Sequence, residues 1–246
     1  MQASTVEQRA ARRVGTTIAG KYLIERVLGA GGMASVYEAV HRNGNRVAIK
    51  MLHEEIAPRG DLRDRFLREG YVANRVSHPG AVRVLDDDLT EDGAAFLVME
   101  LLEGETLRAR AARTGDRLGC REVLALGHQL LDVLQAAHDA RIIHRDIKPE
   151  NLFLTKERVL KVLDFGIARI EDDSGVATTA TGVRMGTPGY MPPELALGRT
   201  SEIDGRTDVW SAGATLFDLI SGEFVHGNAG AAEMVVRAAT EQARSL

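Results

Sequence analysis

The first part of the chain alternates apolar and polar residues with the period of two that is typical of half-buried strands. Such runs lie at 21–29, 35–40 and 45–52, and the Asn-Gly pair at 43–44 favours a hairpin turn between the last two. These runs predict an antiparallel sheet. Residues 1–17 show no sustained apolar period, so we expect a mobile tail or a short frayed helix there.

Helical periods follow these strands in two places. Apolar residues at helical spacing predict a helix over 61–76, and a longer helical pattern covers 121–140. Between them, apolar runs at 81–88 and 94–102 predict two further strands. The chain is thus expected to form a sheet with one inserted helix, followed by a helical part. Residues 171–186 are polar and rich in Gly and Thr, which is typical of a long loop.

The composition of the 246 residues, 44% hydrophobic and 27% charged, suffices for a folded core. The net charge of −4 supplies no basic field, so we expect neither nucleic acid nor a membrane surface as a partner. No apolar stretch approaches the roughly 18 residues of a membrane span, and the single Cys120 fits a reducing compartment. We therefore expect a cytoplasmic location, with an anchor outside this segment left open.

A glycine-rich turn joins the first two predicted strands. Its glycines would let backbone N–H groups approach a phosphate, but a plain turn between strands explains the pattern equally well. Strand alternation puts Ala48 and Lys50 on one face, with room for a flat base beside a cation; a solvated lysine is the alternative. Glu69 in the predicted helix could offer this lysine a carboxylate. Without that context, a Glu69 side chain that faces solvent is the favoured interpretation. The turn comprises Leu28, Gly29, Ala30, Gly31, Gly32, Met33, Ala34, Ser35 and Val36.

The most informative stretch runs from His144 to Asn151 and is followed by Leu163-Asp164-Phe165-Gly166. These two motifs follow the glycine-rich turn and the predicted strand that contains Lys50, and in this order the four features resemble the protein-kinase signature set. The form of the glycine-rich turn is similar to that of bacterial Ser/Thr protein kinases. The resemblance implies an α+β bilobal fold: a small antiparallel β lobe with one helix, and a larger, mostly helical lobe. It places an N-terminal tail at 1–19, the first lobe at 20–102 and the second at 103–246.

The resemblance also implies a role for each polar motif residue. Asp146 would orient the substrate hydroxyl and accept its proton, and Lys148 would reach the γ-phosphate of ATP. Asn151 and Asp164 would bind Mg²⁺, with Mn²⁺ as a possible substitute. Lys50 would contact the α and β phosphates and pair with Glu69.

The adenine base would lie against apolar residues and the strand that follows the inserted helix. Met99 falls at the gatekeeper position, and the backbone of Glu100 and Leu102 would bond the base. Val36, Ala48, Phe153 and Leu163 would sandwich it.

The motifs are similar to those of the Ser/Thr branch of the family, on the basis of Lys148 and Thr187. The expected partners are proteins with Ser or Thr acceptors, together with a second kinase molecule for phosphorylation in trans. Arg145 would bind a phosphate on the loop at 171–186, and Asp208 would brace the segment 144–151. The candidate phosphosites are Thr178, Thr179 and Thr181.

The chain departs from the family pattern in several places. Ala34 replaces a third glycine, Pro192 precedes Pro193-Glu194 where alanine is usual, and 222–226 lacks the usual Pro-Phe pair. The last helices of the second lobe and the arginine that normally pairs with Glu194 are missing. We therefore expect a fragment of a longer chain, with apolar faces exposed on 209–220 and 234–239.

Two other functions remain open from sequence. A nucleotide-binding pseudokinase scaffold would suit a shortened chain, although its catalytic motif residues are intact. A small-molecule kinase is disfavoured by the His-Arg-Asp motif with Lys148. A calcium loop beginning at Asp88 is not expected, because Met99 stands at its twelfth position.

Overall fold

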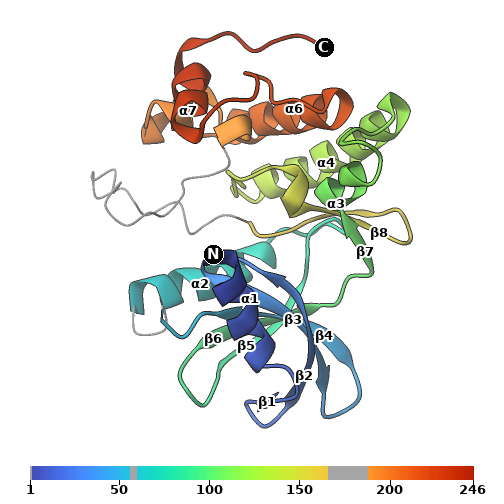
Figure 1. Cartoon of the computed structure of the whole chain (residues 1–246), viewed down its shortest axis with the longest axis vertical. Helices are drawn as coiled ribbons and strands as arrows, with labels where there is room; N and C mark the ends of the chain where they lie inside the picture. Colours follow the sequence, from blue (N-terminus) through green and yellow to red (C-terminus); the bar gives the residue numbers. More distant parts are fainter. Residues whose placement is uncertain (1, 56–59, 166–187) are drawn as a thin grey trace. The chain divides into compact units, whose positions relative to one another are not determined.

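The alternating runs form one antiparallel sheet with six strands, in the order β1-β2-β3-β4-β6-β5 (Figure 1). The computed structural model describes residues 2–55, 60–165 and 188–246, which fall into two compact units. Unit 1 comprises Met1–Asn74 and Val82–Leu102, and unit 2 comprises Arg75–Ala81 and Glu103–Leu246. The strands of the sheet are β1 (Thr17–Ile18), β2 (Tyr22–Ala30), β3 (Ala34–His41), β4 (Arg46–Leu52), β5 (Val84–Leu89) and β6 (Ala95–Glu100).

One face of this sheet forms the core of unit 1. Val47, Ile49 and Met51 alternate into a cluster that also contains Ile24 and Phe96, all of them buried. The β3–β4 turn has the Asn-Gly form that the sequence predicts, and Gly44 adopts φ of +91°, which a residue without Cβ reaches without strain. The period of two therefore determines which side chains of β4 remain on the opposite face.

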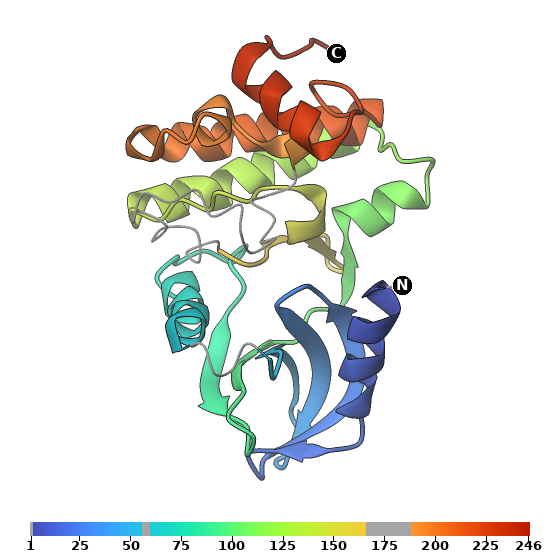
Figure 2. The ribbon, with the colours of Figure 1, turned by 60° about the vertical axis from the view of Figure 1, so that its left-hand side comes forward.

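The N-terminal segment, for which the sequence left a mobile tail or a short frayed helix open, forms a helix in unit 1. Helix α1 (Gln2–Arg12) packs against β2, and Ala10 is buried in the same core cluster as the sheet residues (Figure 2). Just beyond the helix, Arg13 bonds to Glu54 at 2.7 Å and also to Asp92. A small buried residue and an arginine that bonds carboxylates on two loops leave no recognisable pattern in the sequence. This docking could therefore not be predicted.

Helix α2 (Gly60–Ala73) covers the other face of the sheet, and its Phe66 packs with Leu52, Ala95 and Leu97. A Cβ on Gly70 would lie 2.8 Å from the Leu97 side chain, so the helix approaches the sheet closely at this glycine. The helix ends three residues before the predicted 76. The next seven residues after Asn74, 75–81, belong to unit 2, which the sequence pattern did not indicate.

Unit 2 combines a three-stranded sheet with helices. The strands, in the order β7-β8-β9, are β7 (Gly104–Thr106), β8 (Leu152–Thr155) and β9 (Leu160–Val162). The α-helices are α3 (Leu107–Ala112), α4 (Cys120–Asp139), α5 (Pro193–Ala196), α6 (Gly205–Ser221) and α7 (Ala231–Thr240). The short 3₁₀ helices are η1 (Pro149–Asn151), η5 (Pro188–Tyr190) and η6 (Thr200–Glu202).

Helices α4 and α6 of unit 2 pack against each other. A Cβ on Gly127 of α4 would lie 3.0 Å from Leu216 of α6, so the lack of a side chain permits this close packing. Asp204 caps the start of α6, where its carboxylate accepts the Arg206 N–H, and Gly222 caps the end in the left-handed conformation. The helix is therefore held in place at both ends and along its length.

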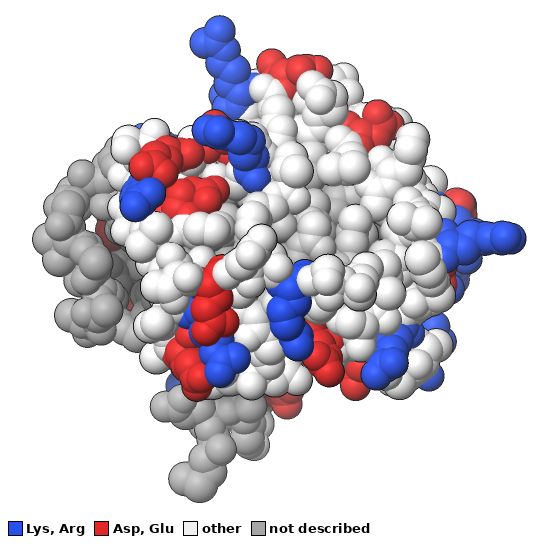
Figure 3. Space-filling model, turned by 90° about the horizontal axis from the view of Figure 1, so that it is seen from above, with Lys and Arg blue, Asp and Glu red and all other residues white. Residues whose placement is uncertain are grey.

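The outer surfaces of α6 and α7 are only partly covered. Val209 is 53% exposed and Val236 is 60% exposed, whereas Leu219 and Ala238 are buried. The end of unit 2 that carries these two helices shows a broad uncharged area with Lys, Arg, Asp and Glu mainly around it (Figure 3). None of the helices in the described ranges is both long and apolar enough to cross a membrane.

Candidate active site

The segment 144–151, which we term the catalytic loop, is anchored by a buried histidine. His144 is fully buried; its Nε2 donates to the Leu163 carbonyl at 2.9 Å, and its Nδ1 accepts the Asp146 N–H at 3.2 Å. This pair of bonds requires a neutral ring with its proton on Nε2. The buried Phe165 ring lies against the imidazole, with 5.1 Å between ring centroids. The start of the loop is thus tied to the chain on both sides of Asp164.

Asp208 of α6 supports the loop from a position with no solvent exposure. Its carboxylate accepts the N–H groups of His144 at 2.8 Å and Arg145 at 2.7 Å, and it also contacts Nε2 of His138 at 2.8 Å. Arg145 adopts φ of +65°, a strained conformation that these bonds hold in place. The hydrogen bond to Asp208 raises the pKa of His138.

Three of the motif residues meet within the loop. Nζ of Lys148 lies 3.0 Å from Oδ2 of Asp146. Nδ2 of Asn151 donates to the same Oδ2 at 3.0 Å and to the Asp146 carbonyl at 2.8 Å. The Asp146 side chain is only partly exposed and is oriented by a cation and an amide from its own loop.

The same contacts determine which atom of Asn151 is left for a metal ion. Because Nδ2 makes both bonds to Asp146, the amide oxygen is the atom that can serve as a ligand. The Leu163 N–H donates to the Asn151 carbonyl at 2.8 Å, which links Asn151 to the residue before the exposed Asp164. The described residues contain no group of three or more His, Cys, Asp or Glu side chains suited to a metal. The amide oxygen of Asn151 and the carboxylate of Asp164 suit Mg²⁺, which prefers oxygen ligands.

In unit 1, the glycine-rich turn is exposed at its tip and held at its base. Gly29 pairs with Val36 and Ala30 with Ser35, and the Gly31 N–H donates to the Ala34 carbonyl at 2.8 Å. The Met33 carbonyl accepts the His53 N–H at 3.0 Å. The turn therefore presents backbone, and few side chains, to the solvent.

Lys50 and Ala48 lie on the face of β4 opposite the core cluster. In the sheet register Lys50 is flanked by Val36 and Leu97, and Ala48 by Glu38 and Met99. Nζ of Lys50 lies 5.9 Å from the centre of the Phe66 ring of α2. Glu69 is in the same helix, and its pairing with Lys50 stays a prediction.

The residues predicted to contact adenine are divided between the units. Val36, Ala48, Met99, Glu100 and Leu102 belong to unit 1, with Met99 packed beside the Phe66 cluster. Phe153 of β8 and Leu163 belong to unit 2. The sandwich around the base therefore stays a prediction.

Four predicted residues, Thr178, Thr179, Thr181 and Thr187, lie outside the described residues. Glu194 accepts a hydrogen bond from the Thr207 hydroxyl of α6 at 2.7 Å.

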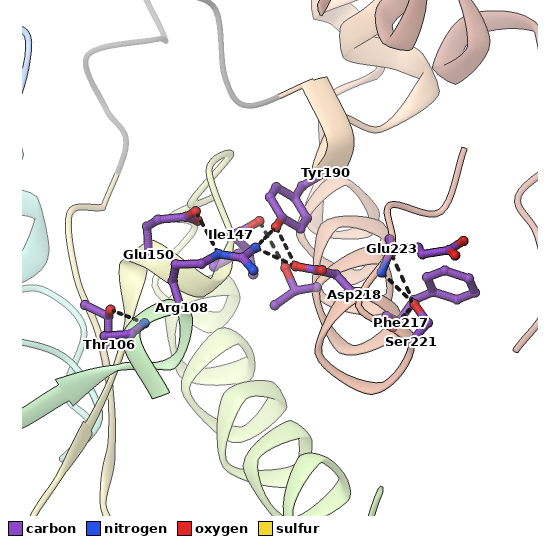
Figure 4. Close-up of polar contacts among 11 residues, drawn as sticks. Thr106, Arg108, Ile147, Glu150, Tyr190, Phe217, Asp218, Ser221 and Glu223 are labelled. Carbon is purple, nitrogen blue, oxygen red and sulfur yellow. Dashed lines mark hydrogen bonds and ion pairs between the residues drawn. The ribbon is translucent and has the colours of Figure 1, made fainter. Parts of the chain in front are cut away.

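The structure adds residues that the sequence reasoning missed. Arg108, Tyr190 and Asp218 form one polar cluster with Glu150 of the catalytic loop (Figure 4). Asp218 interrupts the apolar run Leu216-Phe217-Asp218-Leu219-Ile220. A carboxylate within such a run is the sequence feature that could have indicated a buried polar residue here. Nothing in the sequence near Arg108 indicates its partners, which lie 42 to 110 residues away.

Comparison with known proteins shows which family this chain matches. Residues 22–245 match the model of the protein kinase domain. The chain is 40% identical to the serine/threonine-protein kinase pkn3 of Myxococcus xanthus, with 85% of this chain and 39% of the relative aligned. It is also 40% identical to PknA of Mycobacterium tuberculosis, with 86% of this chain and 49% of the relative aligned. The chain thus spans 39% and 49% of the length of these two curated relatives.

A solved structure is similar over most of the chain. The crystal structure of the Mycobacterium tuberculosis PknI kinase domain matches with a TM-score of 0.67 and 30% sequence identity, over 88% of this chain and 80% of that one. The α+β fold, with an antiparallel sheet in one unit and mainly helices in the other, is therefore the kinase fold that the sequence predicts. With its family-model match and its bacterial Ser/Thr kinase relatives, the chain belongs to the protein kinase family.

Proposed function

We propose that this chain transfers the γ-phosphate of MgATP to Ser or Thr hydroxyls of protein substrates. The observation that carries the proposal is the arrangement of Asp146, Lys148 and Asn151, in which a cation and an amide both contact one carboxylate oxygen. Phosphoryl transfer asks a protein mainly to position its reactants and to stabilise charge, and these three side chains are positioned by one another.

In this proposal Asp146 orients the acceptor hydroxyl and takes its proton as the hydroxyl oxygen bonds the γ-phosphorus, while the bond from that phosphorus to the oxygen that leaves with ADP breaks. Lys148 contacts the transferred phosphoryl group and offsets its negative charge, while Lys50 contacts the other phosphates. Glu69 orients Lys50. The exposed glycine turn contributes backbone N–H groups to the phosphates.

Asn151 and Asp164 would hold the Mg²⁺ ion, which when bound would offset the negative charge of the phosphates and of the leaving group. Asn151 suits this role because its amide nitrogen is already bonded to Asp146. Mn²⁺ has the same preference for oxygen ligands and is expected to substitute.

The proposal is tested by incubating the purified chain with labelled ATP, Mg²⁺ and a mixture of Ser-, Thr- and Tyr-containing peptides. Label on Ser or Thr supports it. Nucleotide binding without transfer to any peptide, protein or the chain itself would instead support the pseudokinase scaffold.

Regulation by phosphorylation of Thr178, Thr179 or Thr181 is a separate part of the proposal. Each added phosphate carries about −1.5 to −2 charges and would bond Arg145, which adjoins Asp146. Modification would occur in trans between two kinase molecules. Replacing the three threonines by Ala should lower transfer to an added substrate and leave ATP affinity unchanged, and full activity of this variant would contradict the switch.

A further inference from the structure

Helix α6 supports the catalytic loop at more than one point. At the start of the loop, Asp208 accepts the N–H groups of His144 and Arg145. In the middle, the Thr215 hydroxyl donates to the Ile147 carbonyl at 3.3 Å. The loop ends at Glu150 and Asn151. Among the described residues, no direct bond from α6 to these two residues is found.

The connection at the end of the loop runs through Arg108, the second residue of α3 (Figure 4). Its Nε donates to Glu150 at 3.2 Å, and its Nη2 donates to Oδ2 of Asp218 at 2.6 Å. The same Nη2 bonds the hydroxyl of Tyr190, which donates in turn to Oδ2 of Asp218 at 2.6 Å. One guanidinium therefore joins the catalytic loop, α6 and η5.

The burial of the partners shows which contact holds the arginine. Asp218 is 3% exposed and Tyr190 is 4% exposed, whereas the Glu150 side chain is 44% exposed. A buried carboxylate needs donors that remain in place, and Arg108 and Tyr190 supply them. The guanidinium is thus fixed by α6 and η5, and its remaining edge is presented to the loop. A planar fork with several N–H donors suits this arrangement, which the single nitrogen of a lysine cannot reproduce.

We propose that Arg108 is a positioning residue that holds the end of the catalytic loop for phosphoryl transfer. The inference rests on the proposed function, in which Asp146, Lys148 and Asn151 carry the chemistry. Glu150 lies between Pro149 and Asn151 in η1, and the Asn151 N–H donates to the Lys148 carbonyl at 3.0 Å. A shift of Glu150 therefore moves the Asn151 amide that bonds Asp146.

The proposal is tested with Arg108→Met, which keeps an unbranched side chain but removes every donor, and with Arg108→Lys, which keeps the charge without the fork. Arg113→Met is the matched control, because Arg113 caps the same helix and its side chain, which is 66% exposed, bonds Glu105 and not the catalytic loop. For each purified variant, kcat and KM for a peptide and for ATP are measured, together with amide hydrogen exchange of the catalytic loop.

In Arg108→Met we expect kcat to fall about 10- to 100-fold, because small displacements of positioned groups have effects of this size. The KM for ATP should change less than kcat, since Lys50 and the glycine turn, which contact the phosphates in the proposed function, are untouched. The amides of Asn151 and Leu163, which bond the Lys148 and Asn151 carbonyls, should exchange faster. Arg108→Lys should recover only part of the rate, and Arg113→Met should behave as the parent chain.

A role in folding alone would lower the melting temperature without changing kcat of the folded fraction or loop exchange, and that result would overturn the proposal. Full activity of Arg108→Lys would overturn the part assigned to the fork. If the parent chain transfers no phosphate, the proposed function fails, but the exchange comparison still decides whether Arg108 holds the loop. If Arg108→Met does not fold, Arg108→Lys and Tyr190→Phe supply the same measurements.

A double-mutant cycle with Glu150→Gln then tests the route of the effect. If Arg108 acts through Glu150, the double variant should be no slower than Arg108→Met alone. Fully additive losses would show that the two residues act independently and would contradict the connection.

Discussion

The glycine-rich turn of unit 1 and the catalytic loop of unit 2 are both assigned to ATP chemistry, yet they are held in opposite ways. The turn is exposed from Gly29 to Met33 and is joined to its neighbours by backbone hydrogen bonds at its base. The catalytic loop is fixed by side chains that lie outside it, above all Asp208 and the Arg108 cluster. The glycine-rich turn can therefore adapt its backbone to a ligand, whereas the catalytic loop is held in position before a ligand binds.

The difference predicts where substitutions act. In the catalytic loop they should reduce the transfer rate or the stability of unit 2. In the glycine turn they should change nucleotide affinity and leave the fold intact.

The largest expected effect follows from Asp146→Asn. The amide cannot accept the proton of the substrate hydroxyl, so kcat should fall about 10²- to 10⁴-fold, the usual range for a lost general base. Nucleotide affinity, measured by fluorescence titration, should stay unchanged. Retention of the parent rate would remove Asp146 from the mechanism.

The next largest effect should be that of Asp208→Ala on stability. The substitution leaves the buried N–H groups of His144 and Arg145 without their acceptor, so the free energy of unfolding should fall by about 3–5 kcal/mol. Urea denaturation measures it. The control is Asp132→Ala, where an exposed carboxylate paired with His78 should contribute less than about 1 kcal/mol. Equal losses in the two variants would contradict the assigned brace.

A smaller effect should appear in the dependence of stability on pH. His226 is 6% exposed and stacks on Trp210, and burial lowers its pKa. Below pH 6.5 the unfolded chain therefore takes up a proton that the folded chain does not, and stability falls as the pH falls toward the folded pKa. The raised pKa of His138 acts in the opposite sense, adding stability that is lost as the pH rises through its folded pKa.

His226→Phe separates the two histidines because it keeps an aromatic ring against Trp210 without a titratable group. The variant should lose the acid-side decline, whose slope for one proton is at most about 1.4 kcal/mol per pH unit. Denaturant unfolding from about pH 5 to 8, the range in which histidines titrate, measures this. An identical pH profile in the variant and the parent chain would exclude His226 as the source.

The smallest effect should come from Gly32→Ala in the glycine turn. An added Cβ meets nothing within 4 Å, so stability should change by less than about 0.5 kcal/mol. The methyl group would stand where a phosphate approaches the backbone, so ATP affinity should fall a few-fold with kcat unchanged. Gly31→Ala, whose Cβ would lie 3.3 Å from the Ala34 carbonyl, should combine this loss with a slight destabilisation. A change in kcat without a change in ATP affinity would contradict this prediction, because that result is expected of substitutions in the catalytic loop.

The sequence determined the elements and the family motifs of this protein, because both are written in local patterns. The period of two in 45–52 separates the Ile49 face from the face of Ala48 and Lys50, and His144 to Asn151 is a continuous motif. Tertiary structure alone decided how those motifs are held. Arg108, Glu150, Tyr190 and Asp218 come from four separate segments, and the contacts of α1 include the small buried side chain of Ala10. Contacts between distant residues depend on how helices pack, and a buried ion pair leaves no periodic pattern along the chain.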